Sequence, residues 1–280
     1  MIRRLMDQDA RREQRRQSLL LDRISNQFED RLAEDIASAM REMVRVWKLT
    51  KEVVTPRDFR AKLDAVYSQM IRSTIVSFGM RVFNQGKDAG VALEHKEDFA
   101  TFMTNEAMRY LAREVIRERI TGVEMTTRQN IIRAIAKAYV DGIGEEQTAD
   151  AILAVIGDIS KARARTIART ESHGAANYGA NEAAKRNGLP MKREWISAED
   201  KRTRTTEDGD LFDHVGANGQ IVAADQPFQI ARLDGGTEAL MYPGDPSGSA
   251  GNVINCRCAL GFIVDVDAIV DAPFSWEKAP

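Results

Sequence analysis

Several residue types that define common protein classes are scarce in this chain. Only two of its 280 residues are cysteine and three are histidine. Two cysteines cannot supply the disulfide framework of a small secreted protein. No apolar run approaches the about 20 residues that a membrane span needs, and the N-terminus lacks the apolar core of a signal peptide. The default expectation is therefore a chain made and kept in the cytosol, with no membrane contact.

An excess of charge of either sign is lacking as well. Lys and Arg number 40 against 42 Asp and Glu, a net charge of −2. This balance excludes a protein that coats nucleic acid by bulk electrostatics, but it allows a local basic patch. Residues 2–18 are rich in arginine. Two interpretations are open: a solvated helix start, or an arm that contacts a partner or DNA phosphates through Arg11, Arg12, Arg15 and Arg16.

Apolar residues at helical spacing dominate the chain up to about residue 187. Hydrophobic residues make up 43% of the sequence, enough for a core. Helix start and stop signals divide this part at Pro56, Gly86, Gly122, the Thr126 capping box and Ser160. The helices predicted from periodicity and these signals cover residues 20–47, 56–86, 96–120, 126–140, 146–156 and 160–187.

After Pro190 the pattern changes to short runs typical of strands, with Gly, Asp and Pro between them. The strands predicted here cover residues 192–197, 219–223, 228–232 and 253–264. The fold class predicted is therefore α+β, with a mostly α-helical N-terminal body and a small C-terminal module of short strands packed on a helix. We expect a helical partner-binding region at 1–125, a second domain at 126–264 and a tail at 265–280.

The predicted helix at 160–187 differs from the others because it is rich in alanine and carries many polar residues. Arg169, His173 and Asn177 stand four residues apart and line one face, whereas Glu171 lies on another. Alanine allows another layer to approach closely. This helix is therefore expected to support the C-terminal module.

Both cysteines lie near the end of the module, separated by one residue. In an extended strand, Cys256 and Cys258 would point to the same side. Such a pair is half of a metal site, a redox pair, or two buried thiols that pack as small hydrophobic groups. A structural zinc ion takes four ligands. His214 would be the third, with the fourth from Glu171, Asp200 or His173.

The same residues allow an enzymatic interpretation. His214 follows Asp213 in a turn and could act as a general base, so a metal-dependent hydrolase or transferase using His214, Cys256 and Cys258 is one alternative. A histidine that only holds a loop in place is the other.

Arg202, Arg204 and Arg257 could bind phosphate, or could pair with the carboxylates of Asp200, Glu207 and Asp208 inside the module.

An ordered set of motifs gives a resemblance. The set comprises Arg169-Thr170-Glu171, Trp195, Asp200 with Arg202 and Arg204, His214, Asn218-Gly219-Gln220, Pro227-Phe228, the segment Tyr242-Pro243-Gly244-Asp245-Pro246, and Asn255-Cys256-Arg257-Cys258. In this order the motifs resemble the phage head-morphogenesis family named after protein F of phage Mu, over roughly residues 130–262. Region 126–264 is accordingly expected to be a Mu F-like domain.

The resemblance implies a minor capsid protein of a phage or prophage, associated with the portal vertex and needed for head assembly and for DNA packaging or delivery. The implied partners are the portal protein, the major capsid or scaffolding protein, and DNA. The implied location is the virion, after assembly in the host cytoplasm. A DNA-binding packaging accessory is a further alternative. The family's usual Asp before Gly-Gln is Asn218 here, and no catalytic residue is assigned.

Overall fold

A computed structural model describes residues 2–88, 96–186 and 190–265, with the backbone alone for residues 2–15, 17, 18 and 88. The helices are α1 (Ile2–Thr50), α2 (Phe59–Asp88), α3 (Lys96–Leu111), α4 (Glu114–Val140), α5 (Glu145–Arg186) and the short α6 (Ala250–Val253). The strands are β1 (Met191–Ile196), β2 (Ile221–Ala223), β3 (Phe228–Ala231), β4 (Thr237–Leu240) and β5 (Ala259–Val264). The predicted α+β class is confirmed.

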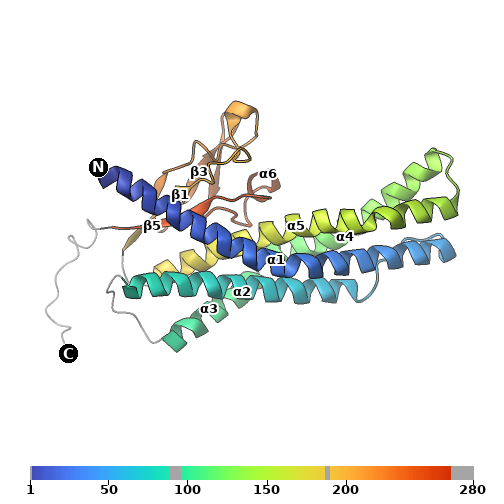
Figure 1. Ribbon diagram of the computed structural model, residues 1–280, viewed down its shortest axis with the longest axis horizontal. Coiled ribbons are helices and arrows are strands. Elements are labelled where there is room, and N and C mark those ends of the chain that lie inside the picture. Colours follow the sequence, from blue (N-terminus) through green and yellow to red (C-terminus); the bar gives the residue numbers. More distant parts are fainter. Residues whose placement is uncertain (1, 89–95, 187–189, 266–280) are drawn as a thin grey trace.

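The helical body is built on α5, which packs against both α1 and α2. Each contributes an apolar stripe that is buried along its length, such as Leu32, Ile36 and Met43 in α1 and Leu63 and Ile75 in α2. Figure 1 shows these long helices side by side, with the strands gathered at one end and the turn between α4 and α5 at the other. Among the described residues no helix is long and apolar enough to cross a membrane.

Two predicted helix boundaries are wrong in the third and fourth helices. Helical structure is interrupted at residues 112–113, between α3 and α4. Helix α4 then continues through Gly122 and Thr126. The Thr126 hydroxyl does not cap a helix start, because it donates to the carbonyl of Gly122, 2.5 Å away in the preceding turn. The buried face of Ile116, Ile120 and Val123 carries the helix across Gly122.

The predicted break before Ser160 is also wrong, because residues 145–186 form one helix. Ser160 is buried, and its hydroxyl lies 3.7 Å from the Met40 sulfur of α1 instead of capping a terminus. Helix α2 begins at Phe59 and not at Pro56, whose carbonyl accepts from the Phe59 N–H at 3.1 Å. Packing against neighbouring helices overrides these local signals.

The module contains two antiparallel sheets, ordered β2-β1-β5 and β3-β4. In the first, Trp195 of β1 lies opposite Leu260 of β5. Strand β4 was not predicted. The strand predicted at 253–264 starts only at Ala259, because α6 and a turn with Asn255 at φ +57° precede it.

The helical body and the module share one hydrophobic core. Its buried residues run from Ile24 in α1 to Leu260 in β5. The boundary expected between residues 125 and 126 falls within α4. Of the expected tail, only Asp265 is described, and its carboxylate pairs with Lys192 at 2.9 Å.

Candidate metal centre

Three donor side chains predicted from the sequence meet in the module. The donor atoms of His214, Cys256 and Cys258 all lie within 4.8 Å of one another, and all three residues are buried. The Nδ1 atom of His214 is 3.4 Å from the Cys258 sulfur and 3.7 Å from the Cys256 sulfur. The predicted convergence is therefore present. The cysteines, however, precede β5 in a loop, so strand alternation is the wrong reason for it.

Hydrogen bonds fix the tautomer of His214. The Asn252 amide donates to the carboxylate of Glu238 at 2.9 Å, which leaves the amide oxygen as an acceptor. That oxygen is 2.7 Å from Nε2 of His214. Nε2 must therefore carry the proton, and Nδ1 presents its lone pair to the two sulfurs. Asn252 and Glu238 were not predicted, because neither lies in a spacing that singles it out.

The two thiols have different surroundings. The hydrogen bond with Cys258, together with contacts to the imidazoles of His173 and His214, holds the pKa of Cys256 well below its usual range despite burial. Burial and the neighbouring Cys256 raise the pKa of Cys258, while the backbone N–H of Ala198 and the Trp195 indole act in the opposite direction. One sulfur of the pair is thus favoured as a thiolate.

Helix α5 supplies the floor of the site. The Asn177 amide donates to the carbonyl of Pro243 at 2.9 Å, and its oxygen accepts from the backbone N–H of Leu260 at 3.1 Å. Its nitrogen also lies 3.1 Å from Nε2 of His173. Arg169, His173 and Asn177 share one face, as predicted, and line a cavity of about 40 Å³ that reaches Cys256.

Two of the three proposed fourth ligands lie elsewhere. Glu171 faces away from the site and pairs with Arg119 of α4, 3.3 Å away, so it is not the fourth ligand. Asp200 pairs with Arg257 at 2.5 Å. Only His173 contacts the cluster, through Cys256.

The arginines of the motifs have internal partners. Arg202 lies 3.8 Å from the Asp200 carboxylate, and Arg204 donates to the carbonyls of Asn252 and Ile254. The internal interpretation is confirmed for Asp200 as the acceptor of Arg202 and Arg257. Arg204 uses carbonyls and not the predicted carboxylates.

The Asn218–Gly219 turn joins the His214 loop to β1. Asn218 accepts from the backbone N–H of Ser197 at 2.9 Å and donates to Glu199 at 3.0 Å. Gly219 has φ +75° and donates to the carbonyl of Trp195 at 2.8 Å. An amide can do both in Asn218, whereas a carboxylate could only accept.

The 242–246 loop fixes the module to α5. Asp245 accepts from the backbone N–H groups of Met241 and Ser247, both at 3.0 Å. A Cβ atom on Gly174 would lie only 2.6 Å from the carbonyl oxygen of Gly244, so the two backbones are in direct contact. On the same side, Thr170 accepts from the N–H of Asn255 at 3.1 Å.

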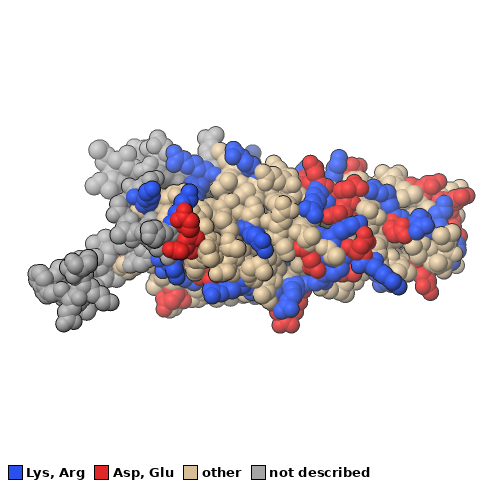
Figure 2. All heavy atoms as spheres, turned by 90° about the horizontal axis from the view of Figure 1, so that it is seen from below, with Lys and Arg blue, Asp and Glu red and all other residues tan. Residues whose placement is uncertain are grey.

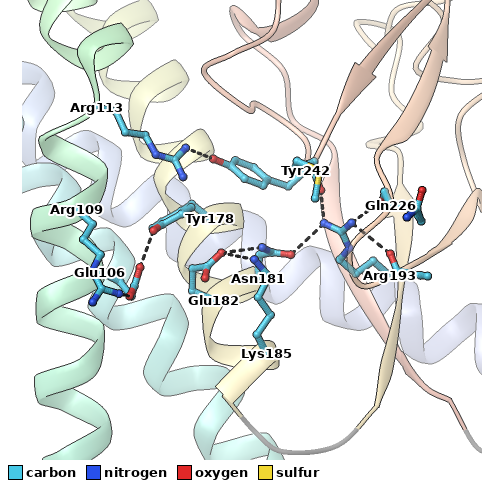
Figure 3. Close-up of polar contacts among 12 residues, drawn as sticks. Glu106, Arg109, Arg113, Tyr178, Asn181, Glu182, Lys185, Arg193, Gln226 and Tyr242 are labelled. Carbon is cyan, nitrogen blue, oxygen red and sulfur yellow. Dashed lines mark hydrogen bonds and ion pairs between the residues drawn. The ribbon is translucent and has the colours of Figure 1, made fainter. Parts of the chain in front are cut away.

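A buried arginine beside this loop was missed. Arg193 of β1 is almost fully buried, and its guanidinium donates to Asn181 and to the carbonyls of Met241, Ala223 and Gln226 (Figure 3). Burial lowers the pKa of Arg193. A signal was available, because strand alternation puts Arg193 on the same face as the buried Trp195.

Tyrosines connect the helical body to the same loop. Tyr178 of α5 donates to Glu106 at 2.7 Å, and Arg113 donates to the Tyr242 hydroxyl at 3.1 Å (Figure 3). The Arg113 guanidinium also lies 4.7 Å from the centre of the Tyr178 ring. The break between α3 and α4 thus places Arg113 against the module.

The arginine-rich start forms part of α1, as the helix interpretation expects. Arg16 is exposed, and the side chains of Arg11, Arg12 and Arg15 lie outside the described residues. Figure 2 shows basic and acidic side chains interspersed over one face of the helical body. DNA contact by these arginines stays a prediction.

Comparison with known proteins gives matches for part of the chain. Residues 129–261 match a family model described as "Phage Mu protein F like protein". The "Uncharacterized protein YqbB" of Bacillus subtilis (strain 168) is 31% identical over 103 residues, which are 37% of this chain and 31% of that protein. No solved structure matches. The chain therefore resembles the Phage Mu protein F-like family over residues 129–261, which include all of α5, the three donor residues and the 242–246 loop.

Proposed function

We propose that this protein is a minor head protein of a phage or prophage, which takes part in head morphogenesis and is carried in the virion. The family match over residues 129–261 carries this proposal. The architecture fits an assembly role, because a rigid module sits at one end of a long helical body (Figure 1). Such a body can place two attachment surfaces far apart.

The partner proposed for the helical body is the portal protein at the head vertex. Apolar side chains are exposed at the end remote from the strands, where Tyr139 is 85% and Val140 84% exposed. Beside them lies a groove of about 640 Å³, which we call the distal groove. It is lined by Trp47, Lys51, Val53, Arg128, Ile132, Ile135, Ala136, Tyr139, Val140, Ile143, Glu145 and Thr148.

The distal groove has the chemistry of a helix-binding surface. Most of its lining residues are aliphatic or aromatic, and Lys51, Arg128 and Glu145 add charged groups, a composition that can accept the apolar face of a partner helix. The groove combines residues of α1, α4 and α5. The contact proposed with the portal protein is therefore not confined to residues 1–125. The major capsid or scaffolding protein and DNA would be met elsewhere on the molecule.

Co-purification with the portal protein of the same phage tests this proposal. The full chain, the double variant Tyr139→Ser/Val140→Ser and a control, Leu211→Ser/Leu233→Ser, would each be tagged and co-expressed with it. The control changes two other exposed apolar residues, which lie in the module and are 47% and 54% exposed. Wild type and control should retain the portal protein and the distal variant should lose it.

Two results would contradict the proposal. If wild-type protein retained no portal protein, the association itself would be wrong. If the distal variant retained as much as the control, the association would stand and the distal groove would be the wrong surface. Circular dichroism of all three proteins would establish that the exposed substitutions leave the fold intact.

A further inference from the structure

We propose that His214, Cys256 and Cys258 bind one zinc ion, through Nδ1 and the two sulfurs, with a water molecule as the fourth ligand. The first argument is distance. Tetrahedral zinc with bonds of about 2.3 Å to sulfur and 2.0 Å to nitrogen holds neighbouring S and N ligand atoms about 3.5 Å apart. The observed separations of Nδ1 from the two sulfurs are 3.4 and 3.7 Å. These separations match the two sulfur–nitrogen edges of such a tetrahedron.

The second argument is the direction of the imidazole lone pair. The Glu238–Asn252–His214 chain of hydrogen bonds puts the proton on Nε2 and turns Nδ1 toward the sulfurs. A metal-binding histidine is commonly held in this way, with its second nitrogen donating to an outer acceptor. A histidine that merely fixed a loop would not need its free nitrogen between two thiols.

The third argument is the set of donors around the sulfurs. The Trp195 indole N–H is buried without a hydrogen-bond partner, sulfur included, and it stands with the Ala198 N–H on the side of Cys258. N–H groups bind a charged sulfur more strongly than a neutral thiol. Two thiolates with one divalent cation and a neutral imidazole would carry no net charge, which removes the cost of burying them. Two thiols packed as hydrophobic groups would leave these donors unexplained.

His173 is assigned to support and not to coordination. Its Nε2 faces the Asn177 amide nitrogen, whose orientation is fixed because the amide oxygen accepts from Leu260. Nε2 is therefore the acceptor and the other ring nitrogen carries the proton, so neither nitrogen of His173 offers a free lone pair to a metal. The fourth ligand then comes from the cavity beside Cys256. Its volume of about 40 Å³ is enough for a water molecule, which needs about 10–15 Å³.

The ligand set selects the metal and its role. Two thiolates and an imidazole suit zinc, whereas calcium and magnesium require oxygen ligands. The ion would join the loop before β5 to the His214 turn. Arg204 already links these segments, because its carbonyl accepts from the His214 N–H and its guanidinium donates to the carbonyls of Asn252 and Ile254. Since both cysteines release their protons on binding, zinc affinity should fall as pH is lowered.

Metal analysis of the full chain tests the proposal. The protein would be purified through a histidine-free tag from zinc-supplemented cells, and its metals measured by mass spectrometry. The expected result is one zinc per chain, lost in Cys256→Ser, Cys258→Ser and His214→Ala and kept in Asp200→Asn and Glu171→Gln. His173→Ala should keep stoichiometric zinc. Asn252→Ala should weaken zinc binding about 10–100-fold, the usual cost of losing an outer partner of a metal ligand.

A second measurement covers variants that fail to fold. Cobalt added to metal-free wild-type protein should give the visible absorption of a tetrahedral site with thiolate charge-transfer bands, and zinc should abolish it. Wild-type protein without zinc and without this spectrum would overturn the proposal, as would stoichiometric iron or copper in place of zinc. Loss of zinc in His173→Ala to the extent seen in His214→Ala would overturn the assignment of water as the fourth ligand.

Discussion

The two halves of α5 have different surroundings. Between residues 145 and 164 the buried positions form one stripe: Thr148, Ala149, Ile152, Ile156, Ser160 and Ala164. From Ala168 to Ala184 nearly every residue is buried, including Arg169's neighbours Thr170 and Glu171 and the polar His173 and Asn177. One helix therefore serves first as a surface helix and then as a central helix.

The difference arises from what covers each half. The first half packs on the helical body, and its remaining sides are exposed, as at Leu153 and Val155. The second half is also covered by the 242–246 loop and by β5, which contact it through Gly174 and Asn177. Close approach on several sides requires small residues, and polar groups there must be paired. The second half is therefore expected to be much less tolerant of substitution.

The largest expected effect is at the buried ion pair of the second half. Changing Arg119→Met leaves the carboxylate of Glu171 buried without its partner, and should lower the free energy of unfolding by about 3–5 kcal/mol. Urea denaturation would measure this loss. Arg117→Met, at an exposed position of the same helix, is the control and should cost about 0.5 kcal/mol or less.

The double variant Arg119→Met/Glu171→Leu sharpens this test. Removing both charges eliminates the unpaired carboxylate, so the double variant should be more stable than Arg119→Met alone. If the single variant lost no more stability than the Arg117→Met control, the ion pair would not be the element that holds Glu171 in the core.

Glycine-to-alanine changes compare the two halves directly. At Gly174 and Gly179 a new Cβ would lie 2.6 and 2.7 Å from backbone carbonyl oxygens of Gly244 and Ile75. Each substitution should cost about 1–3 kcal/mol, because the backbones must separate. At Gly157 nothing lies within 4 Å of the added Cβ, and alanine should gain about 0.5–1 kcal/mol from its better helix propensity.

Thermal unfolding of the three glycine variants would measure the contrast. Gly157→Ala is the same substitution in the same helix as the other two. The comparison therefore separates the effect of packing from the effect of helix propensity. Stabilisation of all three variants would contradict the close backbone contacts and with them the central position of the second half.

Periodicity and composition predict much of this helix but not its continuity. Apolar residues at helical spacing indicated the helical body, and the alanine-rich stretch indicated a close-packed helix. Ser160 was misread as a cap because a buried serine and a capping serine look alike when only neighbours in the sequence are known. Strand β4 was missed because the alternation in Thr237–Leu240 is too short to identify.

The site was predicted in part for a similar reason. His214, Cys256 and Cys258 are rare residue types in this chain, so their presence near motifs drew attention to them. Asn252, Glu238 and Arg119 are common residue types, and their roles depend on contacts between elements that are distant along the chain. No local spacing encodes such partnerships. Glu171 was offered as a metal ligand for this reason, although its partner is Arg119.

The contribution of Glu171 to the stability of the fold should also depend on pH. Burial raises the pKa of Glu171 above its usual 4.5, although Arg119 acts in the opposite direction. The folded state then binds the proton more tightly than the unfolded state, so the contribution of Glu171 to stability is complete below pH 4.5 and is lost as pH rises through the raised pKa. Relative to Glu171→Gln, the wild type should therefore lose stability from pH 4.5 upward and then level off.

Melting temperatures of the two proteins across this range would test the sign. The Glu171→Gln side chain cannot titrate, so effects of all other groups cancel in the difference. A difference that grows in favour of the wild type as pH rises would mean that Arg119 outweighs burial.

The smallest effect on stability is expected at the exposed apolar residues where α4 leads into the first half of α5. Tyr139 and Val140 are largely in water, so changing either to serine should alter the free energy of unfolding by about 0.5 kcal/mol or less. The exposure of these side chains is explained by a partner surface and not by folding. A stability loss as large as that of Gly174→Ala would show that they pack in the folded chain, and would leave the distal groove without its main argument. Unchanged unfolding together with loss of the portal protein would separate partner binding at the distal groove from support of the module by the second half of α5.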